Sequence, residues 1–245
     1  MSINSHIPEK HIHGIDTSIA ELDVLQSRTV APAPMPHQFV GTVLDNTAVL
    51  LTAPANSLDL GGRFATFEHM KNWISVMQAV HRSFYSSILI SVEAGLEFIC
   101  NEHKLAINSH RKFQTDALLD AIQVCIESSP NIDANAHAAL KKLRKQNLPR
   151  RPEFSDYLET ALKASKLDKN KKTQWRKFFQ ALSIVRNKVS HSDPSLNETE
   201  KTSLRGGGFE DLISEDGSLV TNSLHYSPIA TSTLNFFDAL QLNKP

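Results

Sequence analysis

The feature that most constrains the fold is a series of long segments in which apolar residues recur every three or four positions. Between residues 64 and 107, Phe84, Ile88 and Val92 lie four apart, and neighbouring leucines and isoleucines widen the same apolar face. Such spacing is typical of a helix with one buried side. The segment therefore predicts two long helices or one bent helix, and with them a helical core.

The rest of the chain is mostly helical in pattern, with two segments that differ. Residues 37–54 favour one or two short strands around Asp45 and Asn46, and residues 209–224 favour a small β-hairpin around Asp216 and Gly217. We predict an all-α fold with an N-terminal extension over 1–62, partly extended or irregular, and a helical domain over 63–245 that includes the hairpin. Further helices are expected over residues 115–129, 135–146, 153–165, 172–191 and 227–241.

Composition indicates a protein without a membrane anchor. The chain has 245 residues, of which 40% are hydrophobic and 21% are charged, enough to form a sizeable core. The first thirty residues have no apolar run behind a basic start, and the most apolar stretch, residues 83–100, contains Glu93 and Glu97, which would be costly in a bilayer. Cys100 and Cys125 form no paired motif. We expect a cytoplasmic protein with reduced core thiols and no membrane span.

The formal net charge of zero conceals a basic segment. Residues 141–188 hold 15 Lys and Arg against 4 Asp and Glu, an excess of 11 positive charges, whereas the segments before and after it are acidic. A concentration of this kind favours a polyanion such as RNA as partner. The alternative is a solvated helical face that the acidic segments partly neutralise.

Three polar residues interrupt the end of the helix predicted over residues 172–191. Asn187 and His191 are four apart and share one face, and Arg186 lies beside them. Histidine exchanges a proton near neutral pH, arginine can hold two phosphate oxygens, and asparagine can orient either. Together, these three residues are suited to binding a phosphate group. The alternative is that Arg186 and His191 only bond the free carbonyl groups of the last turn.

The segment RNKVSH, residues 186–191, resembles the Arg-x4-His motif of HEPN domains. It lies late on the last long helix of a predicted helical bundle, which is where that family places its motif. The segment HRSFYSSILISVEAGLEFI, residues 81–99, is similar to the family's early helix with its inward glutamate. The resemblance covers about residues 64–242 and implies a HEPN-like helical bundle.

The resemblance also implies an activity, namely RNA cleavage without a metal or cofactor in a homodimer whose motif-bearing helices line one cleft. One His191 would take the proton of a ribose 2'-hydroxyl, and His191 of the second copy would protonate the leaving 5'-oxygen. Arg186 of each copy would stabilise the pentavalent phosphate, and Asn187 would position the imidazole or the phosphate. Glu93, or less readily Glu97, would hold the arginine or the histidine in place.

HEPN relatives include toxins of toxin–antitoxin pairs and effectors of phage defence, so a ribonuclease in one of these roles is implied, with an antitoxin as a candidate partner. The alternative is a HEPN module that binds RNA, a nucleotide or a protein without cleaving. Contacts of the basic segment with the RNA backbone would weaken as salt rises. The residues expected to make them are Lys141, Lys142, Arg144, Lys145, Arg150, Arg151 and Lys188.

Overall fold

The computed structural model describes residues 9–56, 67–107, 110–112, 147–149, 152–240 and 242. The chain divides into two compact units, Met1–Leu105 with Ala161–Pro245, and residues 106–160. The first unit is built from helices, which confirms the predicted all-α class. Its elements are α1 (Glu9–Gln26), α2 (Met35–Asn56), α3 (Phe67–Glu102), α7 (Lys169–His191), α8 (Glu198–Gly207), η1 (Glu210–Leu212), η2 (Ser223–His225) and α9 (Tyr226–Ala239).

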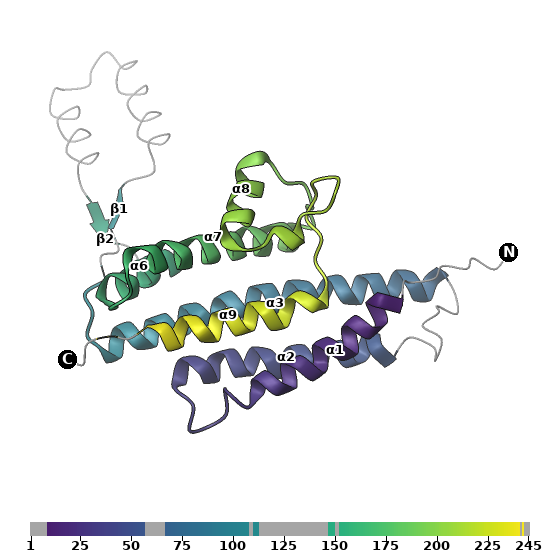
Figure 1. Ribbon diagram of the computed structural model, residues 1–245, viewed down its shortest axis with the longest axis horizontal. Coiled ribbons are helices and arrows are strands. Elements are labelled where there is room, and N and C mark those ends of the chain that lie inside the picture. Colours follow the sequence, from purple (N-terminus) through teal and green to yellow (C-terminus); the bar gives the residue numbers. More distant parts are fainter. Residues whose placement is uncertain are drawn as a thin grey trace, which may run out of the picture. The chain divides into compact units, whose positions relative to one another are not determined.

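Helix α3 forms the centre of the first unit. It is one continuous helix over the segment for which two helices or one bent helix were predicted. Figure 1 shows α3 and α9 side by side, with α1 and α2 on one side and α7 on the other. Phe84, Ile88 and Val92 are fully buried, which confirms the predicted apolar face. The core of the unit therefore lies around the middle of α3.

The apolar character of α3 has a structural explanation. The segment Met70–Glu102 is the one described helix that is long and apolar enough to cross a membrane, and half of its most apolar window is buried inside the structure. A core helix of a soluble protein has the same composition. Near its end, burial raises the pKa of the Cys100 thiol to about 11, so this cysteine stays protonated at neutral pH.

Helix α7 has clear limits and a buried aromatic face. Its first turn begins where the Asp168 carboxylate accepts the backbone N–H of Lys171 at 2.9 Å. The Phe179 ring lies 4.7 Å from the Phe236 ring of α9, and Trp175 lies 5.2 Å from the same ring. These aromatic residues of α7 thus pack in the core and join α7 to α9.

The prediction of short strands within residues 37–54 is wrong, because this segment belongs to α2. Val40, Leu44 and Leu51 are fully buried, and their spacing of four and seven places them on one helix face. The valines and threonines of this segment favour strands in isolation, but the segment forms a helix because its apolar face is buried against α1 and α3. The N-terminal segment is also helical rather than extended over α1.

Residues 213–222, between η1 and η2, form an irregular loop. After η1, one antiparallel bridge joins Ile213 to Leu219, and Gly217 in the intervening turn has a φ of 80°. The turn residues Asp216 and Gly217 are therefore placed as expected, but a two-stranded hairpin is not confirmed. The terminal helix that was predicted over residues 227–241 is present as α9.

The second unit is described over short segments. Strands β1 (His110–Lys112) and β2 (Asn147–Pro149) pair antiparallel, with Arg111 opposite Leu148. Helix α6 (Phe154–Ala164) starts in this unit and confirms the helix predicted over residues 153–165. The helices predicted over 115–129 and 135–146, and with them Cys125, lie outside the described residues.

Candidate functional site

The motif residues lie on the last two turns of α7. Arg186, Asn187 and His191 are all exposed. In the part of the chain that the structure describes, the side chain of none of the three makes a hydrogen bond or an ion pair. Arg186 and His191 stand where the C-terminal end of a helix favours positive charge. Their polar atoms are therefore available to a ligand, and the ligand that suits them is an anion such as phosphate.

The end of α7 is closed by backbone groups and not by these side chains. Ser192 has a left-handed conformation with a φ of 53°, and its N–H donates to the Val189 carbonyl at 3.2 Å. The N–H of Asp193 donates to the Lys188 carbonyl at 3.0 Å. This pattern satisfies the last carbonyl groups in the usual way. The alternative in which Arg186 and His191 serve as caps is therefore not the arrangement found.

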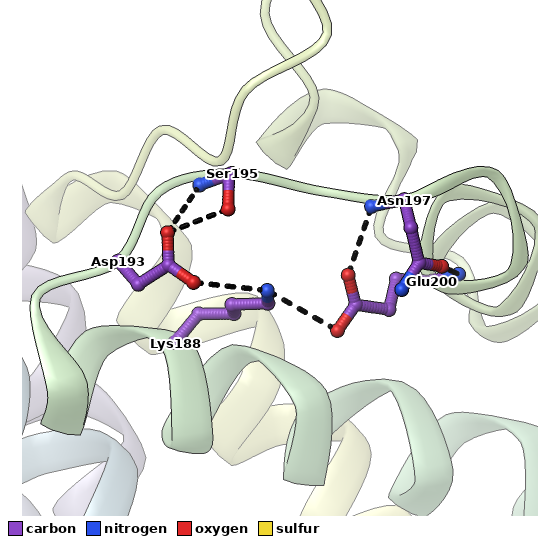
Figure 2. A network of polar contacts seen from close by, with 5 residues as sticks. All are labelled: Lys188, Asp193, Ser195, Asn197 and Glu200. Carbon is purple, nitrogen blue, oxygen red and sulfur yellow. Dashed lines mark hydrogen bonds and ion pairs between the residues drawn. The ribbon is translucent and has the colours of Figure 1, made fainter.

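Lys188 is held by two carboxylates and does not lie free for RNA (Figure 2). Its Nζ lies 3.3 Å from a carboxylate oxygen of Asp193 and 3.3 Å from one of Glu200, and its side chain is 17% exposed. Desolvation lowers the pKa of Lys188, but the bonds to Glu200 and Asp193 outweigh it and raise the pKa above its ordinary value. The other six residues predicted to bind RNA lie outside the described residues.

The same network fixes the loop that follows the motif. The Ser195 N–H and hydroxyl both donate to Asp193, and Glu200 accepts the N–H of Asn197, whose side chain accepts the N–H of Glu200 in return (Figure 2). This reciprocal pair is a capping box that begins α8. Lys188 thus ties the last turn of α7 to the start of α8 and keeps the end of the motif helix in place.

Glu93 makes no polar contact with the motif residues among the described residues. It is half-buried on α3, and no hydrogen bond or ion pair links it to Arg186 or His191 among the described residues. Arg82 of α3 lies beside Ser192, and Glu93 is eleven residues further along α3, about 16 Å at the rise of a helix. Since α3 and α7 run in opposite directions, Glu93 lies level with the middle of α7. Glu97 is one turn further away.

The residues of α3 that do approach the motif were not predicted. The Arg82 guanidinium donates to the Ser192 hydroxyl at 2.8 Å. Beside this bond lies a pocket of about 210 Å³, whose wall includes Gln78 and His81 of α3 and Val189 of α7. Gln78, His81 and Arg82 occur at spacings of three and four, so they share one helix face, and this polar stripe is the signal that could have identified them.

His81 is the most buried polar group of this pocket. It is 8% exposed, and its Nδ1 is hydrogen-bonded to the hydroxyl of Tyr226 on α9. Burial, with a smaller effect of the nearby His225, lowers the pKa of His81 to about 4. Burial also raises the pKa of Tyr226. At neutral pH the pair is therefore an uncharged imidazole and an uncharged phenol.

This lowered pKa predicts a loss of stability in mild acid. The unfolded chain binds a proton at His81 near pH 6.5, whereas the folded chain resists it until about pH 4. The stabilisation is thus complete above pH 6.5 and is lost as the pH falls toward 4. We expect His81 to account for about 2 kcal/mol of the decrease in unfolding free energy between pH 7 and pH 5. Urea unfolding of wild type and His81→Gln at pH 7 and pH 5 measures this contribution. An equal decrease in unfolding free energy in the two proteins would contradict the prediction.

The fold and the site define an all-α protein with an exposed Arg, Asn and His group next to a polar pocket. Comparison with family models, with curated proteins and with solved structures found no match to this chain. Within the described ranges, no three His, Cys, Asp or Glu side chains come together as a metal site would require.

Proposed function

We propose that this chain is a HEPN-type endoribonuclease that cleaves RNA without a metal as a homodimer. The observation that supports it most is the exposure of Arg186, Asn187 and His191 on the last turns of α7, without partners among the described residues. A surface arginine and a surface histidine on one helix end offer charge and proton transfer to the same phosphate. Their exposure also lets the same groups of a second copy face them.

The proposed reaction is an internal transfer at phosphorus. His191 of one copy removes the proton of the ribose 2'-hydroxyl, whose oxygen then attacks the adjacent phosphorus. His191 of the second copy, protonated, gives its proton to the 5'-oxygen as the bond between that oxygen and phosphorus breaks. Arg186 of each copy stabilises the charge on the pentavalent phosphate. The products are a 2',3'-cyclic phosphate end and a free 5'-hydroxyl end.

The proposed biological role is that of a toxin or a phage-defence effector. The basic segment, residues 141–188, would guide the RNA backbone, with an affinity that falls as salt rises. An antitoxin or another protein partner would cover the exposed end of α7. Lys188 contributes less to RNA binding than we expected from the sequence, because its charge is balanced by Asp193 and Glu200.

The second candidate function is a HEPN module that binds RNA, a nucleotide or a protein without cleaving it. The separation of Glu93 from Arg186 and His191 favours this alternative, because no acidic side chain among the described residues orients the proposed general base. A histidine that is not oriented is a weaker catalyst than one held by a partner.

A cleavage assay separates the two candidates. Purified protein is incubated with a mixed RNA pool in EDTA, and the new ends are analysed chemically. We expect cleavage in EDTA that leaves 2',3'-cyclic phosphate and 5'-hydroxyl ends. RNA that is bound but stays intact would favour the module that only binds. Cleavage that stops in EDTA would contradict the proposed mechanism.

A further inference from the structure

We propose that the pocket beside the motif binds one unpaired base of the RNA, so that the base next to the cleaved phosphate selects the site of cleavage. The pocket lies between the first half of α3, the end of α7 and the loop before η2. This inference rests on the proposed ribonuclease function and names the part of the RNA that the enzyme reads.

The position of the pocket suits a nucleotide that lies on the motif. Ser192 is part of its wall and directly follows His191. Lys188 of α7 is also part of the wall, and Asn187, which shares a face with His191, lies about 100° from Lys188 around the helix axis. A nucleotide whose phosphate contacts His191 can therefore extend its base across the edge of α7 into the pocket.

The wall combines apolar surface with polar edges, which is what a base requires. Val189, Pro194 and Leu219 offer apolar contacts to the faces of a ring, and Gln78 and Thr221 offer hydrogen bonds to its edge. Its volume of about 210 Å³ lies below the roughly 300–1,000 Å³ of typical small-molecule sites. The space therefore suits one ring-sized group rather than a larger ligand.

His81 adds one oriented hydrogen-bond donor. Among the described residues, the Tyr226 hydroxyl has His81 Nδ1 as its one hydrogen-bond partner, and a buried hydroxyl proton without an acceptor would be costly, so we infer that Tyr226 donates to Nδ1. Donation to Nδ1 leaves the proton of the neutral ring on Nε2, which has no hydrogen-bond partner among the described residues, and the His81 ring is part of the pocket wall. A carbonyl oxygen or a ring nitrogen of a base can accept this proton.

The charges around the pocket favour an uncharged ligand. Lys188 is balanced by Asp193 and Glu200, which leaves one excess negative charge. Arg82 supplies one positive charge through a guanidinium that bonds to Ser192 and pairs with no carboxylate among the described residues. The local sum is zero, so a free phosphate gains little, whereas an uncharged base can stack on the guanidinium plane.

The test measures binding of free ribonucleosides, which carry a base but no phosphate. Adenosine, cytidine, guanosine and uridine are each added to the full chain, and saturation transfer from the protein to the base protons is recorded by NMR. We expect transfer to at least one nucleoside, with affinity at least fivefold weaker in Thr221→Trp and in Gln78→Ala. Thr173→Trp is the matched control, because Thr173 is exposed near the other end of α7.

The outcomes are distinct from those of the cleavage assay, because binding of a free nucleoside requires neither a phosphate nor cleavage of RNA. Transfer to no nucleoside, or transfer only to ribose, would overturn the base pocket even if RNA is cleaved. Equal affinity in wild type and in folded Gln78→Ala and Thr221→Trp would also overturn it. Since Gln78 is exposed, its replacement should leave the fold intact. If Thr221→Trp does not fold, Gln78→Ala by itself still tests whether the pocket binds the base.

Discussion

Replacement of His191 by alanine is expected to abolish RNA cleavage by this protein. The proposed reaction uses this imidazole twice, as a base in one copy and as an acid in the other. Loss of one general acid or base typically lowers a rate by about 10²–10⁴-fold, and the alanine variant removes both at once. His191 is exposed, and its side chain makes no hydrogen bond or ion pair among the described residues, so its removal should not disturb the fold.

The measurement compares initial cleavage rates of wild type and His191→Ala on one RNA in EDTA. Ser190→Ala is the matched control, because Ser190 is exposed on the same turn of α7. Arg186→Lys tests the second group, since lysine keeps the charge but loses the two-pronged contact with phosphate. Circular dichroism and sedimentation should show unchanged helix content and assembly. A cleavage rate for His191→Ala equal to that of wild type would remove this residue from the mechanism.

Replacement of Phe236 by alanine is expected to cause the largest loss of stability. This α9 side chain is fully buried, and its ring centre lies 4.7 Å from that of Phe179, 5.2 Å from Trp175 and 5.3 Å from Phe237. Truncation of such a ring removes apolar burial and leaves a cavity, at a cost of about 3–5 kcal/mol. This is a large part of the roughly 5–15 kcal/mol by which typical domains are stable.

Urea unfolding followed by circular dichroism measures the change in unfolding free energy. Ile90→Ala serves as the control, because Ile90 is also apolar and helical but is 64% exposed, and it should change stability by less than about 0.5 kcal/mol. A loss below about 1 kcal/mol for Phe236→Ala would show that α7 and α9 are not joined through this aromatic cluster.

The helices that the sequence predicted well are those with a strong periodic pattern and local end signals. The helix predicted over residues 172–191 begins three residues earlier, at Lys169, where Asp168 accepts the N–H of a residue three positions later, so both partners lie in a short window. The same holds for the apolar face of α3, whose members recur every turn. The candidate residues Arg186, Asn187 and His191 were also found locally, because they share the end of one helix.

Helix α2 is the element for which the local sequence pattern gave the wrong prediction, namely short strands. Its valines and threonines favour strands, and the helical spacing of Val40, Leu44 and Leu51 was outweighed by this preference. Burial against α1 and α3 adds more free energy than the preference of single residues, and that burial depends on segments far away in the chain. The local pattern alone therefore pointed to the wrong element.

The sequence by itself determined the all-α class, the approximate positions of the strongly periodic helices and the polar group at the end of α7. Only the tertiary structure decided what surrounds that group. It tied Lys188 to Asp193 and Glu200, kept Glu93 apart, and brought His81 and Arg82 of α3 to the end of a helix 110 residues later. The physical reason is that periodicity and end signals act over a few residues, whereas hydrogen bonds and ion pairs between helices depend on how those helices pack.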